Sequence, residues 1–420
     1  MSTSAATGSK SPVQDNEEFE LHISDLTNLG SGVGRRLLPS GLKWVVMVPL
    51  VLPGEDVMVR IVRNHSSYSE AELVRVINAS PARIEPQCKY FTQCGGCQYQ
   101  HMNVSTQRNW KRSQVKAALQ RVGGLPDVVI NSAVGTEHVY EYRTKLTPHY
   151  SITKDTRAVQ VGFRRRESHE LVDVTQCPIA SPAVNTAYSD ERRRLHNSAS
   201  QVKGKKSDGT LLLREDGSGV VHTDQAKQVA CTVNGLKFQF KAGEFFQNNP
   251  FVLPLLVAHV VQRAVGEEDC THLIDAYCGS GLFALSAAAR FQAVLGVEVS
   301  AAAVDSAKRN AKRNGIQNAE FVAGTAERIF ASTVRLSAGE CAVVLDPPRR
   351  GCDPAFLQQL LAFRPRRIVY VSCDPATQAR DAKVLVAAGY TIADATPFDL
   401  FPQTRHIENV ITFTRIVIAN

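Results

Sequence analysis

The sequence predicts an α/β protein built from a small N-terminal β-barrel, a central α+β module and a C-terminal doubly wound domain with a mainly parallel sheet. Three observations support this prediction. The length of 420 residues exceeds what one compact core normally holds. Short alternating apolar runs, separated by Gly and Pro turns, fill residues 19–76 and are typical of a small barrel. From about residue 243 onward, apolar strands alternate with helical segments, as in a parallel sheet covered by helices.

These patterns divide the chain into four segments. Residues 1–16 are rich in Ser, Ala and Thr and predict a disordered lead-in. We expect the barrel over residues 17–80, the central domain over 81–242 and the Rossmann-like domain over 243–420. Within the central domain, residues 103–124 have the pattern of a basic helix.

Composition and charge narrow the function classes. The chain has 44% hydrophobic and 21% charged residues, and no apolar run is long enough to span a membrane. Its beginning has neither the apolar core of a signal peptide nor the arginines of a transit peptide, so we expect a cytoplasmic protein. The net charge is +8, and residues 103–166 hold twelve Lys or Arg against four Asp or Glu. This stretch suits a nucleic acid, although charge alone fits a solvated surface equally well.

Two glycine-rich segments precede different kinds of structure. No helical pattern comes after Gly30-Ser-Gly-Val-Gly34, so these glycines predict a turn or bulge between barrel strands. Asp275–Gly281 instead lies between an apolar strand and an Ala-rich helix, so Gly279 and Gly281 allow a ligand close to the backbone. Glu298 ends the next strand, where a carboxylate can bind ribose hydroxyls. The loop lacks the third glycine of dinucleotide sites, which favours S-adenosylmethionine over NAD.

Three polar residues are expected at the same edge of the sheet as this loop. Asp346 begins the turn Asp346-Pro-Pro-Arg349, and Cys373 follows the next apolar strand. Glu408 lies on the loop before the last strand. Amine methyltransferases have an aromatic residue at the place of Arg349, where it stacks on a flipped adenine, and this difference argues against an exocyclic amine as the methyl acceptor.

The chemistry of uracil C5 explains why these residues would occur together. C5 is too weak a nucleophile to attack a sulfonium unaided, but a Cys373 thiolate that adds to C6 gives C5 carbanion character. Glu408 can then remove the C5 proton so that the thiolate leaves. The residues therefore predict uracil-C5 methylation with Cys373 as nucleophile and Glu408 as base. A cytosine-C5 enzyme would need a second cysteine where Asp346 stands.

Four cysteines form a candidate metal or cluster site. Cys88, Cys94 and Cys97 leave gaps of five and two residues, and Cys177 could complete a four-thiolate set. Zinc and an iron-sulfur cluster fit four thiolates about equally well, and the five-residue gap, wider than in most zinc knuckles, favours iron-sulfur. Radical S-adenosylmethionine enzymes need gaps of three and two residues with an open iron, so this spacing argues against that class.

Together these motifs resemble the bacterial RNA 5-methyluridine methyltransferases, especially the 23S ribosomal RNA members with an N-terminal TRAM barrel and an iron-sulfur cluster. The resemblance extends from about residue 19 to the C-terminus. Besides the cofactor loop and the four cysteines, it rests on six runs: Tyr142-Arg-Thr-Lys145, Gly162-Phe-Arg164, Glu244-Phe-Phe-Gln-Asn-Asn249, Asp346-Pro-Pro-Arg-Arg-Gly351, Ser372-Cys-Asp-Pro375 and His406-Ile-Glu408.

The resemblance implies the cofactors and the residues that hold them. It implies a [4Fe-4S] cluster on the four cysteines and S-adenosylmethionine in the glycine loop. It also implies that the helical stretch after Cys97 packs on the catalytic domain. The implied cofactor contacts come from four residues: Gln247, Tyr277, Glu298 and Asp346.

The resemblance further implies RNA as the partner, no membrane partner and a monomer. We expect 23S ribosomal RNA as the substrate, bound through the barrel and the basic stretch. Thr144 stands where many relatives have Asn, and Leu282 where some transfer-RNA members have Asn, and both differences concern the choice of RNA. Two alternatives remain open: a transfer-RNA uracil-5 methyltransferase, and a non-catalytic iron-sulfur protein that binds RNA.

Overall fold

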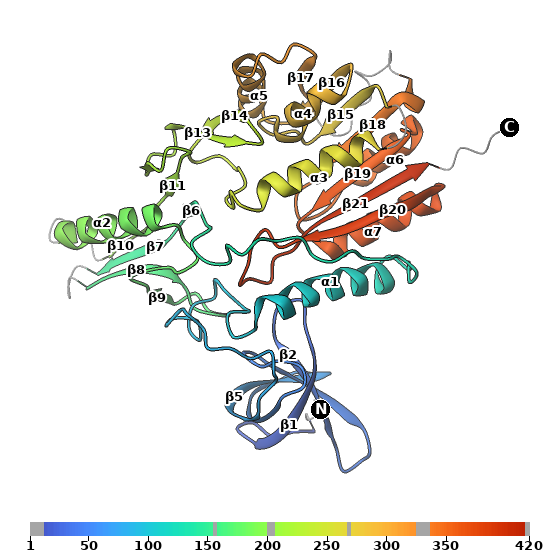
Figure 1. Cartoon of the computed structure of the whole chain (residues 1–420). Helices are drawn as coiled ribbons and strands as arrows, with labels where there is room; N and C mark the ends of the chain where they lie inside the picture. Colours follow the sequence, from blue (N-terminus) through green and yellow to red (C-terminus); the bar gives the residue numbers. More distant parts are fainter. Residues whose placement is uncertain (1–11, 154–157, 200–205, 267–269, 325–336, 416–420) are drawn as a thin grey trace, which may run out of the picture. The chain divides into compact units, whose positions relative to one another are not determined.

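The computed structural model describes residues 12–153, 158–199, 206–266, 270–324 and 337–415. Within these residues the chain forms two compact units, coloured along the sequence in Figure 1. The first unit runs to Gln107 and includes Gln403–Arg405, and the second runs from Arg108 to Pro402 and resumes at His406.

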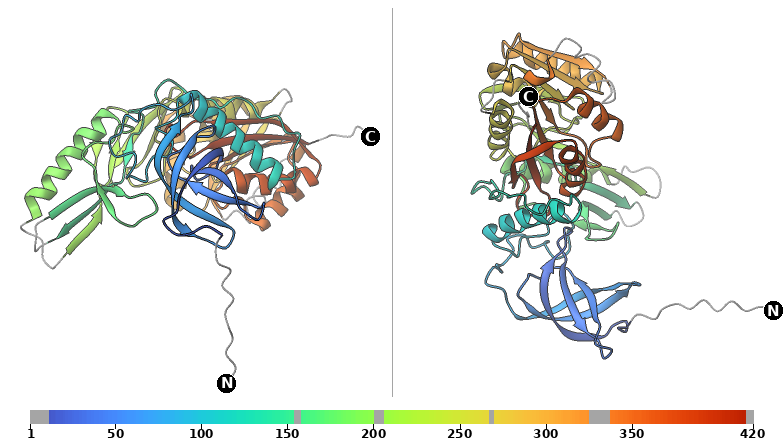
Figure 2. Two further views of the ribbon diagram at one scale, coloured as in Figure 1. Left: turned by 90° about the horizontal axis from the view of Figure 1, so that it is seen from below. Right: turned by 90° about the vertical axis from the view of Figure 1, so that its right-hand side faces the viewer.

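The first unit contains a closed five-stranded barrel with the strand order β1-β2-β3-β5-β4, seen in blue in Figure 2. Inward-facing Val, Ile and Leu side chains alternate with exposed polar ones and fill the interior. Its strands are β1 (Glu18–Leu26), β2 (Gly32–Leu37), β3 (Lys43–Val48), β4 (Asp56–Asn64) and β5 (Tyr68–Asn78).

The beginning of the described chain is packed against the barrel. Val13 is only 3% exposed and belongs to the barrel core, and its carbonyl accepts a hydrogen bond from Asn64 Nδ2 at 3.1 Å. Residues 12–16 therefore differ from the predicted disordered lead-in over residues 1–16, because the Val13 side chain and backbone hydrogen bonds, such as that from the Asn16 amide to the Ile61 carbonyl at 3.0 Å, hold them on the barrel. Residues 1–11 of that prediction lie outside the described residues.

Two positions in the barrel require glycine, each for a different structural reason. Gly30 has a φ of +90° in the turn between β1 and β2, a conformation that favours glycine. A Cβ at Gly34 in β2 would lie 2.4 Å from Leu21 Cγ, so this strand packs too closely for a side chain. The turn predicted for the segment Gly30–Gly34 is confirmed at Gly30, whereas Gly32 and Gly34 lie in β2.

The second unit begins at Arg108, within the long helix α1, and continues with three small antiparallel sheets. The sheets have the orders β10-β7-β8-β9, β12-β11-β6 and β13-β14. The elements are α1 (Val104–Arg121), β6 (Lys145–Leu146), β7 (His149–Thr153), β8 (Ala158–Arg164), β9 (Leu171–Asp173), α2 (Pro182–Ser198), β10 (Lys206–Thr210), β11 (Leu213–Glu215), β12 (Val221–His222), β13 (Gln228–Val233) and β14 (Leu236–Lys241).

A seven-stranded sheet dominates the second unit, with the order β17-β16-β15-β18-β19-β21-β20. All neighbours are parallel except β21, which runs antiparallel between β19 and β20. Its elements are α3 (Leu253–Val265), β15 (His272–Ala276), α4 (Leu282–Ala287), η2 (Ala288–Arg290), β16 (Ala293–Glu298), α5 (Ala301–Arg313), β17 (Ala319–Ala323), η4 (Ala338–Glu340), β18 (Cys341–Leu345), α6 (Pro354–Phe363), β19 (Arg367–Ser372), α7 (Pro375–Ala387), β20 (Tyr390–Phe398) and β21 (Glu408–Arg415).

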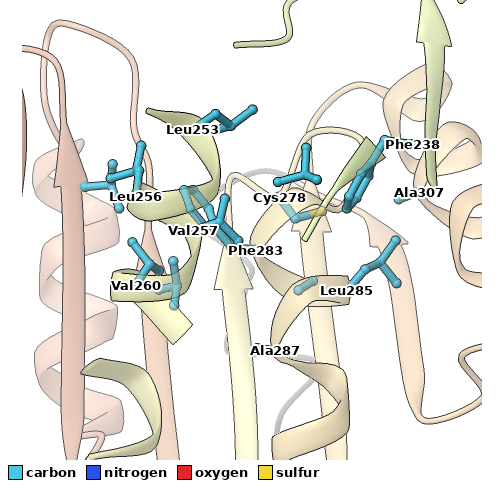
Figure 3. Close-up of a cluster of buried hydrophobic side chains, with 14 of the residues drawn as sticks. Phe238, Leu253, Leu256, Val257, Val260, Cys278, Phe283, Leu285, Ala287 and Ala307 are labelled. Atoms are coloured by element: carbon cyan, nitrogen blue, oxygen red, sulfur yellow. The ribbon is translucent and has the colours of Figure 1, made fainter. Parts of the chain in front are cut away.

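Helices cover both faces of this sheet, as expected for a doubly wound fold. Side chains of α3, α4 and α5 pack over one face, and Figure 3 shows part of this layer, with Val257 of α3 beside Phe283 of α4. On the other face, α6 and α7 share a core with Val115 and Leu119 of α1. The helix that we expected near residues 103–124 therefore contributes to the core of the seven-stranded sheet.

The two compact units differ from the predicted division at residues 80 and 242. The hairpin β13-β14 explains part of the difference, because its Phe238 and Phe240 pack in the same core as α3 and α4. Segments on both sides of residue 242 therefore fold around one core. Among the described helices, none combines the length and the apolar character that crossing a membrane would require.

Candidate active site

The loop between β15 and α4 has a backbone that few residues tolerate. Gly279 and Gly281 have φ values of +54° and +89°, and Tyr277 has +68°, which is uncommon for a residue with a side chain. Beneath the loop, buried Asp275 accepts a hydrogen bond through Oδ2 from the Ala284 amide at 2.8 Å and so fixes the start of α4. This loop is open on one side, since a Cβ at Gly279 would meet no atom within 4 Å.

Glu298 ends β16 beside this loop, as predicted from the sequence. Its Oε2 accepts from the Gly279 amide at 3.1 Å and its Oε1 from the Ser300 amide at 2.9 Å. Each oxygen keeps a lone pair, which a ribose hydroxyl can use. Glu298 therefore both shapes the loop and can bind a ligand on it.

Two buried acceptors, one beneath this loop and one in the segment before α3, lack a protein donor. Oδ1 of Asp275 and Oε1 of Gln247 have no hydrogen-bond partner among the residues that the structure describes. Buried polar atoms are normally satisfied, so both point to a ligand that donates hydrogen bonds. The ammonium and hydroxyl groups of S-adenosylmethionine provide such donors, and the residues present fit this cofactor.

The carboxyl groups at this edge of the sheet also favour a cationic ligand. Burial, with smaller contributions from the charges of Asp346 and Glu298, raises the pKa of Asp275 to about 8, and the hydrogen bond from the Ala284 amide opposes this shift. Burial likewise raises the pKa of Asp346 to about 7. A positive charge beside these groups lowers their pKa values and offsets the cost of ionising them. A sulfonium meets this requirement, whereas a negatively charged dinucleotide does not.

The strand register brings the predicted nucleophile and base together. Ser372 of β19 pairs with Asn409 of β21, and the next residues in this antiparallel register are Cys373 and Glu408. Asp374 then caps α7 by accepting from the Ala376 and Thr377 amides, so Cys373 directly precedes a helix N-terminus. A helix N-terminus stabilises a thiolate.

The electrostatic surroundings of Cys373 favour the thiol in the absence of ligands. Burial raises the pKa of Cys373 to about 11, and the charges of Glu408 and Asp346 act in the same direction. The Arg349 guanidinium opposes them through its charge and a hydrogen bond. Glu408 is only 2% exposed, and burial followed by the charge of Asp346 raises its pKa well above the ordinary value. Thiol, cation and two carboxyl groups thus interact at one edge of the sheet.

Helix α7 holds the turn that carries Arg349. Thr377 Oγ1 donates to the Arg349 carbonyl at 3.0 Å and Arg380 donates to the Arg350 carbonyl at 3.1 Å. Asp381 accepts from the Cys352 amide at 2.8 Å. The turn after Asp346 is therefore fixed from the same helix that begins just after Cys373.

A second set of contacts fixes the chain that leads to Glu408. Three successive carbonyls of the loop after β20 each accept a hydrogen bond from a buried side chain: Leu400 from Asn249 at 2.9 Å, Phe401 from Lys111 at 3.0 Å and Pro402 from Tyr142 at 3.0 Å. These donors come from three distant parts of the sequence, and we call this arrangement the loop clamp.

The loop clamp includes a buried ion pair. Lys111 Nζ lies 2.6 Å from Asp399 Oδ1, and both side chains are fully buried. Arg108 Nε lies 3.3 Å from the other oxygen of Asp399. Burial lowers the pKa of Lys111, and the Asp399 carboxylate opposes this shift. A buried pair of this kind fixes a local geometry because breaking it leaves an uncompensated charge.

Comparison with known proteins identifies the family. The family model of tRNA (uracil-5-)-methyltransferases matches residues 187–416. A tRNA (uracil(54)-C(5))-methyltransferase of Schizosaccharomyces pombe is 37% identical over 97% of this chain and 80% of its own length. The chain belongs to this family. It is an S-adenosylmethionine-dependent RNA uracil-C5 methyltransferase.

Other relatives of this methyltransferase cover nearly the whole chain. The tRNA (uracil(54)-C(5))-methyltransferase of Saccharomyces cerevisiae is 31% identical over 95% of the chain and 74% of its own length. An uncharacterized RNA methyltransferase of Halalkalibacterium halodurans is 32% identical over 96% of the chain and 98% of its own length. The solved structure of Pyrococcus abyssi tRNA (uracil-54, C5)-methyltransferase with S-adenosyl-L-homocysteine has a TM-score of 0.70 at 23% identity, covers 94% of this chain and 100% of its own, and shows the shared fold.

The predicted iron-sulfur cluster has no support in the structure of this methyltransferase. Cys88, Cys94 and Cys97 lie in the first unit and Cys177 in the second. Within the described ranges, no group of three or more His, Cys, Asp or Glu side chains is arranged to hold a metal ion. Cysteine spacing therefore predicted more than the folded chain supports, and no step of the proposed mechanism uses a cluster.

Sequence reasoning missed several residues that support the active site. Asp275 was part of the predicted loop, but nothing in its spacing indicated a buried, partly unsatisfied carboxyl group. Lys111 was counted only within a basic stretch, although an apolar flank such as Val115 one turn later could have indicated a buried helix face. The sequence singles out Arg349 only as the replacement of an aromatic residue, and its effect on Cys373 is apparent only from the structure.

Proposed function

We propose that this methyltransferase acts on uridine 54 of transfer RNA, with Cys373 as the covalent nucleophile and Glu408 as the base. The observation that supports the chemistry is the antiparallel register that sets Cys373, just after β19, beside Glu408 at the start of β21. The interacting charges of Asp346 and Arg349 add to it.

We assign cofactor binding to the glycine loop and its neighbours. Glu298 binds the ribose hydroxyls, and the unsatisfied oxygens of Asp275 and Gln247 accept hydrogen bonds from the cofactor. Gly279 leaves room for it, whereas Gly281 lets the loop pack closely on Leu285 and Phe321. When bound, S-adenosylmethionine supplies a methyl group carried on a positively charged sulfur.

The protein's own residues then act in sequence on the uracil. The Cys373 thiol releases its proton to water, and the thiolate sulfur adds to C6, which shifts electron density to C5 and O4. Arg349 stabilises the thiolate before this addition. After C5 has accepted the methyl group, Glu408 takes the C5 proton, and the C6–S bond breaks to restore the ring and the thiolate. A base fixed by the loop clamp removes this proton without reorganising the site.

The proposed substrate follows from the relatives. Both fungal relatives are named for uridine 54 of transfer RNA. The expected preference for 23S ribosomal RNA has no support among the named relatives, so we propose the transfer-RNA alternative in its place. The clearest test is mass spectrometry of both RNA classes from a strain that lacks the gene. Loss of 5-methyluridine from transfer RNA alone supports the proposal, and loss from ribosomal RNA alone overturns it.

The chemistry is tested with RNA that contains 5-fluorouridine, since fluorine at C5 cannot be removed as a proton. Wild-type protein with cofactor should form an adduct that survives denaturation. Cys373→Ala should form none, and Cys231→Ala, a half-buried cysteine in β13, should behave as wild type. Glu408→Gln should accumulate adduct on ordinary uridine RNA. An adduct that persists in Cys373→Ala would exclude this thiol as the nucleophile.

A further inference from the structure

Two positive side chains face each other in the small sheet β12-β11-β6. Lys145 of β6 pairs directly with Arg214 of β11, and directly opposed like charges destabilise an antiparallel pair. Arg143, two residues before Lys145, lies close enough to both to lower their pKa values. Three cations thus gather at one position of the fold, and we call them the cation cluster.

The cation cluster is connected to the segment that carries Gln247. The Arg214 guanidinium is almost fully buried, and it donates to the Glu244 carbonyl at 3.2 Å and to the Phe246 carbonyl at 3.4 Å. Thr144, directly before β6, donates through Oγ1 to the Asn248 carbonyl at 3.2 Å. The cluster therefore lies beside the segment to which we assign cofactor contact.

Lys145 is the member of the cluster with an unused charge. Its side chain is half-buried, and within the described part of the chain its ammonium makes neither an ion pair nor a hydrogen bond. Burial, together with the charges of Arg214 and Arg143, lowers the pKa of Lys145 to about 8. A negatively charged ligand beside the Lys145 ammonium would raise this pKa again and stabilise the charged form.

Nearby carboxylates do not neutralise the cluster. Glu215 follows Arg214 on the strand, so its side chain points to the other face, where it accepts a hydrogen bond from Ser181. Glu244 accepts from the Lys241 amide at 3.1 Å. The protein itself thus supplies no anion for Lys145 from these neighbouring positions.

We propose that Lys145, supported by Arg143 and Arg214, binds a phosphodiester group of the substrate RNA next to the target uridine. This inference rests on the proposed function, because the RNA must place a nucleotide at Cys373. Phosphate is the anion that RNA presents at every nucleotide, and Lys and Arg contacts to it position the strand. Half-burial strengthens such a contact, because the surrounding protein screens the charges less than water does.

The test compares Lys145→Gln with Lys227→Gln, an exposed lysine between β12 and β13, by measuring RNA affinity over a range of salt concentrations. Loss of one phosphate contact should reduce the slope of log affinity against log salt by about 0.7–0.9. We expect roughly tenfold weaker binding at low salt for Lys145→Gln, since one charge-assisted contact is lost. Lys227→Gln should match wild type, and Lys145→Arg should retain most of the slope.

Two further measurements make the outcome unambiguous. Affinity for S-adenosylmethionine, measured without RNA, should be unchanged in Lys145→Gln. If this variant instead lost cofactor affinity and kept the wild-type salt slope of RNA binding, the cation cluster would be assigned to the cofactor carboxylate and the proposal overturned. An unchanged salt slope in folded Lys145→Gln would also overturn it. Adduct formation on 5-fluorouridine RNA at saturating concentration should persist in Lys145→Gln. Absence of the adduct in the wild type would instead refute the proposed function.

Discussion

Replacing Lys111 by Met tests the loop clamp. The change removes the ammonium that lies 2.6 Å from Asp399 and 3.0 Å from the Phe401 carbonyl, and keeps most of the side-chain volume. Breaking a buried ion pair from one side costs about 3–5 kcal/mol, because the remaining charge is left without its partner. Arg108 stays 3.3 Å from Asp399 and reduces this cost, so we expect about 3 kcal/mol.

Thermal unfolding measures this prediction. At about 2–4 °C per kcal/mol for a domain of this size, the melting temperature of Lys111→Met should fall by roughly 10 °C. The matched control is Lys116→Met, an exposed lysine on the same helix, which should stay within about 0.5 kcal/mol of wild type. The double variant with Asp399→Asn should recover about 1–3 kcal/mol relative to the sum of the single changes, because the unpaired charge is gone.

The same variant tests whether the clamp serves catalysis. The clamped loop leads to Glu408, so kcat for methyl transfer, measured well below the melting temperature, should fall while KM for RNA changes little. A Lys111→Met protein within about 1 kcal/mol of wild-type stability, or a double variant that shows only additive losses, would refute the reasoning from the buried pair.

Three other predictions concern the cofactor loop and its carboxyl groups. Gly279→Ala and Gly315→Ala both place a Cβ in open space at positive φ and should each cost about 1 kcal/mol of stability. Only Gly279→Ala should weaken S-adenosylmethionine binding, by tenfold or more in calorimetry. Equal cofactor affinities of the two variants would contradict the assigned cofactor position. Burial raises the pKa of Asp346 to about 7, and we expect the enzyme to need its ionised form, so the methyl-transfer rate at saturating substrates should rise with pH through about 7. A flat rate profile between about pH 6 and 8 would argue against a need for ionised Asp346. The pKa of Asp275 is about 8 in the folded chain against an ordinary 3.8, so at pH values between these two the folded state holds a proton that unfolding releases. The free energy of unfolding should therefore fall as pH rises from 3.8 to about 8, by at most about 1.4 kcal/mol per pH unit. Thermal unfolding of Asp275→Asn should lack this fall.

Local sequence patterns determined much of this protein. The alternation of apolar strands and helices predicted the doubly wound sheet, and short alternating runs predicted the barrel, because both patterns depend on residues a few positions apart. Gly279, Glu298 and Cys373 were found for the same reason, since each lies at the end of a strand that is visible in the sequence. Cysteine spacing was a weaker guide, because ligand geometry depends on segments that spacing does not place.

Only the tertiary structure decided which of these residues interact. Glu408 meets Cys373 because β21 inserts antiparallel between β19 and β20, an order that no local pattern specifies. Lys111 and Asp399 are 288 residues apart in the sequence, and their pairing follows from the packing of α1 on the sheet. The pKa values of the active-site carboxyl groups likewise depend on burial and on neighbouring charges. The sequence thus determined the chemical groups and their strand ends, and the packing of distant segments determined their partners and their protonation.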